Sequence, residues 1–398
     1  YEISCSLVGS EMCIRDSKSP ILRTVKKDET VTIVESGEKW TKVCTKDGYI
    51  GYVKNRQLDK AEKKELKSDF KEPEITHNLK KEKINMAWHQ VTEQAANSTL
   101  ANVLSTTKGV NVISPTWFYL NDNNGGIKTL ASSDYVTYAH QHNVEVWALV
   151  SNLENPDVDT TQVLTHTSTR ENLTNNLISA AIRYDLDGIN VDMEALSTDA
   201  GEGYIQFIRE LSIKCKKNDL VLSIDNYVPS SYTAFYNRKE QSCFADYIVI
   251  MGYDEHYKGS EEAGSVASID FVKNGIKDTL KEVSAEQTIL ALPFYTRLWA
   301  ETTGEDKKVT VTSEVVKMNN QQTVVNNSGA SPKWSDKYGQ YYIEYQKDGK
   351  TYKMWMEESK SIEQKLKAAK KAKIAGTSVW KLGMEDPTVW DTIIKYVN

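Results

Sequence analysis

The sequence has 398 residues, of which 39% are hydrophobic and 26% are charged, enough for one large core and a small additional domain. Its formal net charge is −6, so electrostatics give no reason to expect a nucleic acid or an anionic membrane as a partner. No run of about 18 or more apolar residues occurs, so no membrane span is predicted. The cysteines form no C-x-x-C pair and the histidines are dispersed, so neither a metal site nor a cofactor is expected.

Residues 1–17 do not fit the hydrophobic periods of the chain that follows. Within them, the segment LVGSEMCIRDS at 7–17 resembles the translation of a transposase adapter used in sequencing-library preparation. We therefore expect residues 1–17 to be a non-native artefact, with the natural N-terminus missing and no biological role for Cys5 and Cys13. The alternative is a natural, poorly ordered tail.

Short β-rich runs separated by turn signals predict a small all-β barrel over residues 18–58. The runs cover residues 21–25, 30–35, 40–45 and 50–53. The segment GYIGYV at 48–53 resembles the bacterial Src-homology-3-like module of cell-wall enzymes. The resemblance implies an accessory domain that binds cell-wall peptide, and a structural spacer without a ligand stays open as the alternative. Residues 59–83, rich in Lys and Glu, are predicted to be a charged linker.

Beyond residue 84, apolar runs of strand length alternate with amphipathic stretches of helix length, which predicts an α/β fold. The runs cover residues 84–88, 110–114, 144–150, 188–193, 221–224, 247–251, 288–292 and 376–380. Eight such strands favour a (β/α)8 TIM barrel over residues 84–398. A doubly wound sheet is the alternative, but no G-x-G-x-x-G follows the first strand. Residues 300–358 are predicted to be a small α+β insertion before the last strand.

The fourth predicted strand carries an unusual set of polar residues. Alternation along a strand sends Asn190, Asp192 and Glu194 to one face, and Ile189 and Val191 to the other. The apolar face is expected to pack against helices, which leaves an amide and two acids inside the barrel. Neighbouring buried carboxylates repel, so one of them should keep its proton near neutral pH, as a general acid must. Glu194 is the expected donor, and a structural acid pair satisfied by a neighbouring Lys or Arg is the alternative.

The segment Asp187–Glu194 (DGINVDME) looks like the D-G-x-x-x-D-x-E signature of family 18 glycoside hydrolases, and the similarity extends from residue 84 to the C-terminus. Three further segments support this resemblance: MGYD at 251–254, LPFYTR at 292–297 and VW at 379–380. The resemblance implies a retaining mechanism in which the nucleophile is the substrate's own 2-acetamido oxygen.

By this resemblance, Glu194 would protonate the leaving oxygen and then activate water, Asp192 would orient the acetamido group, and Tyr253 would donate its hydroxyl to that group. Further residues are expected to line the substrate site: Asp187, Asn190, Met251, Asp254, Trp380, Trp117, Tyr295 and Arg297. For the aromatic residues, core packing is the alternative role.

Asn190 stands where many chitinases have an Asp, and Met193 where they often have an aromatic residue. These departures favour the branch of the family that resembles spore-cortex and cell-wall hydrolases. The sequence therefore predicts a peptidoglycan N-acetylglucosaminidase, extracellular or associated with the cell wall. A chitinase or chito-oligosaccharide hydrolase, or a catalytically silent carbohydrate-binding barrel, are the alternatives.

Overall fold

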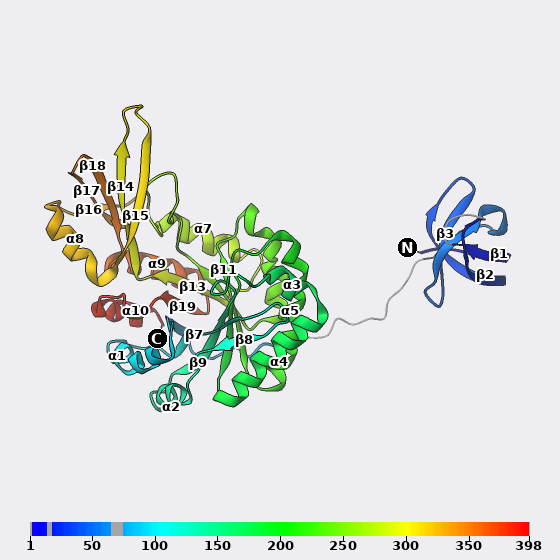
Figure 1. Ribbon diagram of the computed structural model, residues 1–398, viewed down its shortest axis with the longest axis horizontal. Helices are drawn as coiled ribbons and strands as arrows, with labels where there is room; N and C mark the ends of the chain where they lie inside the picture. Colours follow the sequence, from blue (N-terminus) through cyan, green and yellow to red (C-terminus); the bar gives the residue numbers. More distant parts are fainter. Residues whose placement is uncertain (1, 14–17, 65–74, 398) are drawn as a thin grey trace. The chain divides into compact units, whose positions relative to one another are not determined.

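The computed structural model describes residues 2–13, 18–64 and 75–397. The chain divides into two compact units, residues 1–74 and residues 75–398 (Figure 1). Among the described residues, no helix combines the length and the apolar character that crossing a membrane requires.

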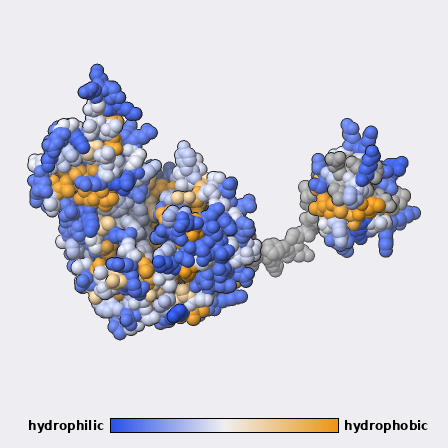
Figure 2. All heavy atoms as spheres, in the orientation of Figure 1, coloured by the Kyte–Doolittle hydropathy of each residue, from blue (hydrophilic) through white to orange (hydrophobic). Residues whose placement is uncertain are grey.

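The first unit is a small antiparallel β structure, as predicted. Its strands are β1 (Glu2–Cys13), β2 (Ile21–Ser36), β3 (Trp40–Thr45), β4 (Ile50–Lys54) and β5 (Glu62–Lys64), with the short 3-10 helix η1 (Asn55–Gln57) after β4. The sheet order is β2-β3-β4-β1-β5, and β1 also pairs with β2. Its core consists of Met12, Val25, Val31, Val43 and Val53. In Figure 2, apolar residues gather on the visible face of this unit.

Two details of this unit differ from the prediction. Residues 21–36 form one strand rather than two. Asp28 in its middle has a positive φ of 66°, and the register with β1 shifts nearby, so the strand bends at this point and then continues. Residues 2–13 form the paired strand β1 rather than a tail without structure, and residues 14–17 lie outside the described residues. The origin of residues 1–17 stays a prediction.

The predicted linker 59–83 is longer than the segment between the two units. At its start, β5 pairs with β1 of the first unit. At its end, the Asn78 N–H donates to Asp246 Oδ1 at 2.7 Å and the Lys80 N–H donates to the Tyr247 hydroxyl at 2.6 Å, so this part packs on the second unit. The middle, residues 65–74, lies outside the described residues.

The second unit is a closed barrel of eight parallel strands surrounded by helices, which confirms the predicted TIM barrel. The strands are β6 (Ile84–His89), β7 (Val112–Leu120), β9 (Glu145–Ser151), β10 (Gly188–Asp192), β11 (Val221–Tyr227), β12 (Tyr247–Met251), β13 (Thr288–Pro293) and β19 (Gly376–Trp380). Pairing of β6 with β7 closes the barrel, and the short strand β8 (Ile127–Thr129) adds antiparallel to β7.

The helices follow the barrel strands in the order that the sequence predicts. They are α1 (Leu100–Ser105), α2 (Ser133–Gln141), α3 (Thr160–Thr165), α4 (Thr167–Tyr184), α5 (Gly201–Lys217), α6 (Arg238–Phe244), α7 (Ile269–Thr279), α9 (Ser359–Ala372) and α10 (Trp390–Val397). Short 3-10 helices are η2 (Gln94–Thr99), η3 (Thr198–Ala200), η4 (Ser231–Tyr236) and η6 (Pro387–Val389).

The insertion before the last barrel strand is a separate sheet with one helix. It comprises β14 (Tyr295–Thr303), β15 (Val309–Lys317), η5 (Met318–Asn320), α8 (Gln321–Ser328), β16 (Lys333–Ser335), β17 (Gln340–Lys347) and β18 (Lys350–Met356), in the sheet order β15-β14-β18-β17-β16. It begins at residue 295, a few residues before the predicted 300, because β14 starts almost directly after β13. The hairpin of β14 and β15 projects from the barrel (Figure 1).

Gly188, at the start of β10, lies beside a large aromatic side chain in the barrel interior. Large aromatic side chains fill this interior, with Trp147 stacked on Tyr247 at a centroid distance of 5.5 Å. A Cβ at Gly188 would lie 2.8 Å from the Trp147 ring and 2.8 Å from the Val221 carbonyl oxygen. The glycine at the start of β10 therefore makes room for the tryptophan beside it.

Candidate active site

β10 places its polar residues inside the barrel, as alternation predicts, while Ile189 and Val191 join the cluster that packs against the helices. Asn190 is fully buried. Its Oδ1 accepts hydrogen bonds from Trp88 Nε1 at 2.9 Å and from Ser114 Oγ at 3.0 Å. Its Nδ2 is a donor to two groups on β11.

The two acceptors of Asn190 Nδ2 on β11 are Ser223 Oγ at 3.0 Å and Asp225 Oδ1 at 2.8 Å. An amide can accept on one side and donate on the other, which a carboxylate cannot do. Asn190 therefore holds Asp225, and both of its side-chain polar atoms have partners within the barrel. Its contact with substrate stays a prediction.

Asp225 completes a carboxylate cluster with Asp192 and Glu194. Burial raises the pKa of the Asp192 carboxyl well above its usual range, and the charges of Asp225 and Glu194 raise it further. Burial also raises the pKa of Asp225, and the hydrogen bond from Asn190 opposes this increase. Asp192 Oδ1 and Asp225 Oδ2 are buried with no hydrogen-bond partner in the described part of the chain. Burial thus favours the protonated form of these carboxyls, and two of their oxygens have no partner among the described residues.

Glu194 follows β10 at the C-terminal mouth of the barrel, where its backbone is fixed by Asn152. Asn152 Oδ1 accepts from the Glu194 N–H at 2.8 Å, and Asn152 Nδ2 donates to the Glu194 carbonyl oxygen at 2.9 Å. Burial raises the pKa of the Glu194 carboxyl, a hydrogen bond from Tyr227 opposes this increase, and the charge of Asp254 adds to it. A half-buried carboxyl with a raised pKa at the mouth of a barrel can act as a proton donor.

The end of β12, the loop that follows it and the start of the insertion bring five more predicted residues to the same mouth. Tyr253 lies edge-on to Tyr295 with ring centroids 6.2 Å apart. The Tyr295 hydroxyl donates to Asp254 Oδ1 at 2.6 Å. Arg297 Nη1 donates to Ser313 Oγ at 3.1 Å, and its buried Nε has no partner among the described residues. Met251 at the end of β12 is buried.

Trp380 ends β19 and lies partly exposed at the mouth. Its ring meets that of Trp88 edge-on, with centroids 5.8 Å apart and an interplanar angle of 61°. The Trp380 carbonyl oxygen accepts a hydrogen bond from the Phe294 N–H at 2.7 Å, which ties the end of β19 to the start of the insertion. A partly exposed indole in this position offers an apolar floor for a sugar ring.

Two other predicted residues are not brought to the carboxylate cluster, Asp187 because it precedes β10 and Trp117 because it packs in the cluster that faces the helices. Asp187 precedes β10 at the opposite edge of the barrel, where its Oδ2 accepts from the Val146 N–H and lies 2.8 Å from His140 Nε2. Trp117 is fully buried, and its Nε1 donates to Asn97 Oδ1 at 2.8 Å. Neither side chain lies beside the carboxylate cluster, and their contact with substrate stays a prediction.

Four residues at the mouth were not predicted: Asn152, Glu154, Asp225 and Tyr227. The alternation of Ser223, Asp225 and Tyr227 on β11 could have indicated the last two, because it repeats the polar pattern of β10. Asn152 and Glu154 come from the turn after β9, where no periodic signal exists.

Two other features bear on the choice of site. A cavity of about 740 Å³ lies beside α5 and includes none of the carboxylate cluster. Its basic residues Arg170 and Arg209 are paired with Glu210 and Glu240, so it has no free charge from these groups. Within residues 2–13, 18–64 and 75–397, no group of three or more His, Cys, Asp or Glu side chains is placed to hold a metal ion.

Comparison with known families matches both units. The model of the glycosyl hydrolases family 18 matches residues 87–385, and that of the bacterial SH3 domain matches residues 15–59. The glycosylase YvbX of Bacillus subtilis (strain 168) is 27% identical over 324 residues, which cover 76% of this chain and 92% of that protein. The cortical fragment-lytic enzyme of the same organism is 24% identical over 281 residues, 67% of this chain and 63% of that protein.

Solved structures share the fold of the second unit. The chitinase from Chromobacterium violaceum ATCC 12472 superposes with a TM-score of 0.69 at 20% identity, covering 79% of this chain and 98% of that chain. The Bacillus cereus spore cortex-lytic enzyme SleL superposes with a TM-score of 0.70 at 18% identity, covering 79% and 74%.

Proposed function

Because this chain belongs to family 18 of the glycosyl hydrolases and is a glycoside hydrolase, we propose that it cleaves β-1,4-linked N-acetylglucosamine glycans, with bacterial peptidoglycan as its substrate. The observation that carries the proposal is the carboxylate cluster, in which burial and like charges raise the pKa of Asp192 and burial raises that of Glu194 at the barrel mouth. A retained proton is what cleavage of a glycosidic bond requires of its acid.

In the proposed mechanism, Glu194 gives its proton to the glycosidic oxygen while the substrate's 2-acetamido oxygen attacks the anomeric carbon and displaces the leaving sugar. The resulting oxazolinium-like intermediate is then opened by water, which returns its proton to Glu194. Asp192 accepts the acetamido N–H, for which its buried and unpartnered Oδ1 is available. Tyr253 donates its hydroxyl to the acetamido group, and Trp380 lies beneath the sugar ring.

Tyr295 and Arg297 of the insertion, together with Asp254 of the loop after β12, form one side of the proposed site. The hydrogen bond from Tyr295 fixes the Asp254 carboxylate. The unpartnered Arg297 Nε is a donor that a sugar hydroxyl or carboxylate could use. Met251 adds apolar surface at the end of β12.

The choice of peptidoglycan over chitin rests partly on Lys381. This residue follows Trp380, is half-buried, donates from Nζ to the Gln90 side-chain oxygen, and takes part in no ion pair of the described residues. Burial lowers the pKa of its ammonium group, and the charge of Lys317 lowers it further. A half-buried cation without a carboxylate is stabilised by an anionic ligand. Peptidoglycan carries carboxylates on its stem peptides, or on its lactyl groups where the peptide is missing, whereas chitin carries none.

The names of several relatives, cortical fragment-lytic and spore cortex-lytic enzymes, support a wall glycan. The attached SH3 domain supports it too, with proposed binding of wall peptide through an exposed surface around Tyr49. There, the Arg23 guanidinium lies 5.9 Å from the Tyr49 ring, and Ile50 beside it is exposed. We place the enzyme outside the cell or at the wall, where such a substrate occurs.

Hydrolysis of chitin is the second candidate, favoured by the common fold with chitinases. Reducing-end analysis by mass spectrometry, with purified peptidoglycan and colloidal chitin as parallel substrates, separates the two. Muropeptides that end in reducing N-acetylglucosamine are the expected product. Chito-oligosaccharides alone would assign the enzyme to chitin, and binding of either glycan without release would favour the carbohydrate-binding alternative.

A further inference from the structure

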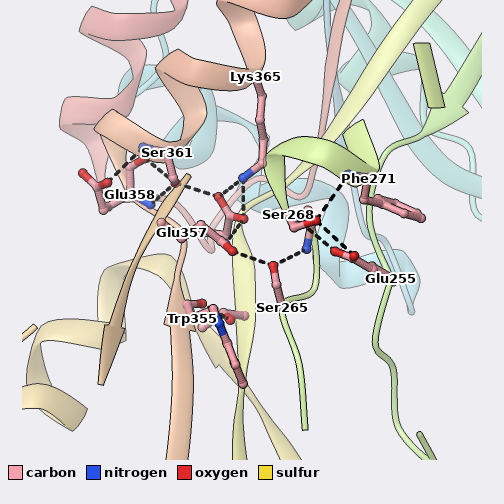
Figure 3. A network of polar contacts seen from close by, with 12 residues as sticks. Glu255, Ser265, Ser268, Phe271, Trp355, Glu357, Glu358, Ser361 and Lys365 are labelled. Carbon is pink, nitrogen blue, oxygen red and sulfur yellow. Dashed lines mark hydrogen bonds and ion pairs between the residues drawn. The ribbon is translucent and has the colours of Figure 1, made fainter. Parts of the chain in front are cut away.

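A buried polar cluster joins the insertion to the barrel, and we call it the insertion clamp (Figure 3). Its members, Ser265, Gln340, Glu357, Ser361 and Lys365, are all fully buried. Lys365 Nζ donates to both carboxylate oxygens of Glu357, at 2.6 and 2.7 Å. Ser361 Oγ donates to Glu357 Oε2 at 2.8 Å, and Gln340 Nε2 donates to Oε1 at 2.5 Å. Four hydrogen bonds thus surround one carboxylate.

The members come from three segments that are distant in the sequence. Gln340 begins β17 and Glu357 follows β18, so both belong to the insertion, whereas Lys365 lies on α9 of the barrel. Ser265 lies in the loop after β12, which spans residues 252–268. Its hydroxyl donates to Gln340 Oε1 and accepts from the Ala267 N–H at 3.1 Å. The clamp therefore reaches this loop through one side-chain hydrogen bond.

That loop carries residues of the proposed site. Tyr253 and Asp254 begin it, and Glu255 ties its two ends together: the Glu255 N–H donates to the Val266 carbonyl oxygen at 2.9 Å. The Glu255 carboxylate accepts from the Ser268 N–H at 2.8 Å and from Ser268 Oγ at 3.0 Å. Figure 3 shows Ser265 between this carboxylate and the ion pair. A displacement of Ser265 would therefore pass to Asp254 through a short closed loop.

Apolar side chains could hold the insertion against α9 as well as a buried ion pair does. The ion pair also fixes orientation, which apolar contacts do not. Lys365 orients the Glu357 carboxylate, this carboxylate orients the Gln340 amide, and the amide oxygen accepts from Ser265. We propose that the insertion clamp positions loop 252–268, so that Tyr253 and Asp254 stay in place beside Glu194. Its members are positioning residues that touch no substrate. This inference rests on the proposed glycosidase function.

Replacing Glu357 or Lys365 would leave a buried charge unpaired and could prevent folding, so the test uses Ser265→Ala, which keeps the ion pair. The matched control is Ser212→Ala on α5, another buried serine, whose hydroxyl donates to the Arg209 carbonyl oxygen at 2.9 Å. We expect Ser265→Ala to lower kcat roughly tenfold with little change in KM. The displaced Tyr253 and Asp254 would still allow the glycan to bind but would no longer hold it in the geometry that the reaction requires. Ser212→Ala should leave both constants close to those of the wild type, with a similar melting temperature.

A second pair of variants tests the route through the loop. In a background that carries both Tyr253→Phe and Asp254→Asn, Ser265→Ala should cost less than about twofold in kcat, because residues that act through one another are not additive. A full tenfold loss in that background, or an unchanged kcat in the wild-type background, would overturn the proposal.

Hydrogen exchange at residues 252–258 tests the clamp without any glycan. It should increase in Ser265→Ala and not in Ser212→Ala, and equal exchange in both variants would also overturn the proposal. A wild-type enzyme that cleaves neither peptidoglycan nor chito-oligosaccharides would refute the proposed function, while exchange would still decide the clamp.

Discussion

Asn152 holds both backbone polar groups of Glu194, accepting from its N–H at 2.8 Å and donating to its carbonyl oxygen at 2.9 Å. Asn152 directly follows β9, the strand that pairs with β10, so the end of one barrel strand fixes the residue beyond the end of its neighbour. The next residue, Ala195, has a positive φ of 51°, and its N–H donates to the Tyr227 hydroxyl at 3.1 Å. The direction of the Glu194 side chain is therefore set by groups outside its own strand.

Replacement of Asn152 by Ala should lower kcat on a glycan roughly 10²-fold with little change in KM, because a displaced acid no longer reaches the glycosidic oxygen. Asn152→Asp is the matched variant: it keeps the acceptor for the Glu194 N–H and loses the donor to the carbonyl oxygen, so an intermediate loss is expected. Steady-state kinetics on chito-oligosaccharides measures both. Equal activity of Asn152→Ala and the wild type would show that β10 alone positions the acid.

The hydrogen bond from Tyr227 lowers the pKa of Glu194, since it stabilises the charged carboxylate. Removing it with Tyr227→Phe should raise the pKa of Glu194, so the acid keeps its proton to a higher pH. The alkaline limb of the kcat/KM profile should therefore move to higher pH. Tyr236→Phe is the control, because the Tyr236 hydroxyl accepts from the Leu196 N–H at 3.2 Å. The same shift in both variants, or a shift to lower pH, would contradict this assignment.

Asn190→Asp restores the residue that many chitinases have, and it should destabilise this protein. The substitution removes the Asn190 amide group that donates to Ser223 and Asp225, and it adds a negative charge beside Asp225. The expected cost is about 1 to 3 kcal/mol near neutral pH. Burial would raise the folded-state pKa of the new acid above its unfolded value, so the loss should shrink as pH falls and the carboxyl is protonated. Urea unfolding at pH 7 and pH 5 measures this, and a loss that grows at pH 5 would contradict it.

If Lys381 binds substrate carboxylates, Lys381→Gln should lower kcat/KM on peptidoglycan roughly tenfold relative to kcat/KM on a chito-oligosaccharide of similar length. Gln removes the charge and retains a hydrogen-bond donor. Lys395→Gln on α10 is the control lysine, outside the proposed site. A ratio that stays constant in Lys381→Gln would mean that this ammonium group does not distinguish the two glycans.

The barrel was predictable because period-two and helical patterns alternate regularly along the chain, and most predicted strands agree with the observed ones to within two residues. The position of Trp117 was not. The prediction ended this strand at residue 114, but β7 continues to Leu120, and Trp117 lies three residues after the inward-facing Ser114, on the opposite face. Trp117 consequently packs among buried residues between strand and helices, with Tyr135 at 4.8 Å.

The placement of Asp192 and Glu194 close together was predictable, because both lie on or directly after a single strand. Asp187 matches the same motif but precedes the strand, so it lies at the opposite end of the barrel from the acid. Alternation along β11 could have indicated Asp225, but not that it lies beside Asp192, and Asn152 had no signal at all, because both placements depend on which strands become neighbours. The pairing of β10 with β9 and β11 supplies that information.

The central claim is that Glu194 supplies the proton that cleaves a wall glycan. The most direct test is the rate of reducing-end release from purified peptidoglycan by the wild type and by Glu194→Gln, with binding to the same material measured in parallel. The account predicts a loss of about 10² to 10⁴-fold in release, with binding retained. Release by Glu194→Gln at the wild-type rate would contradict it, and the acid would have to be sought elsewhere.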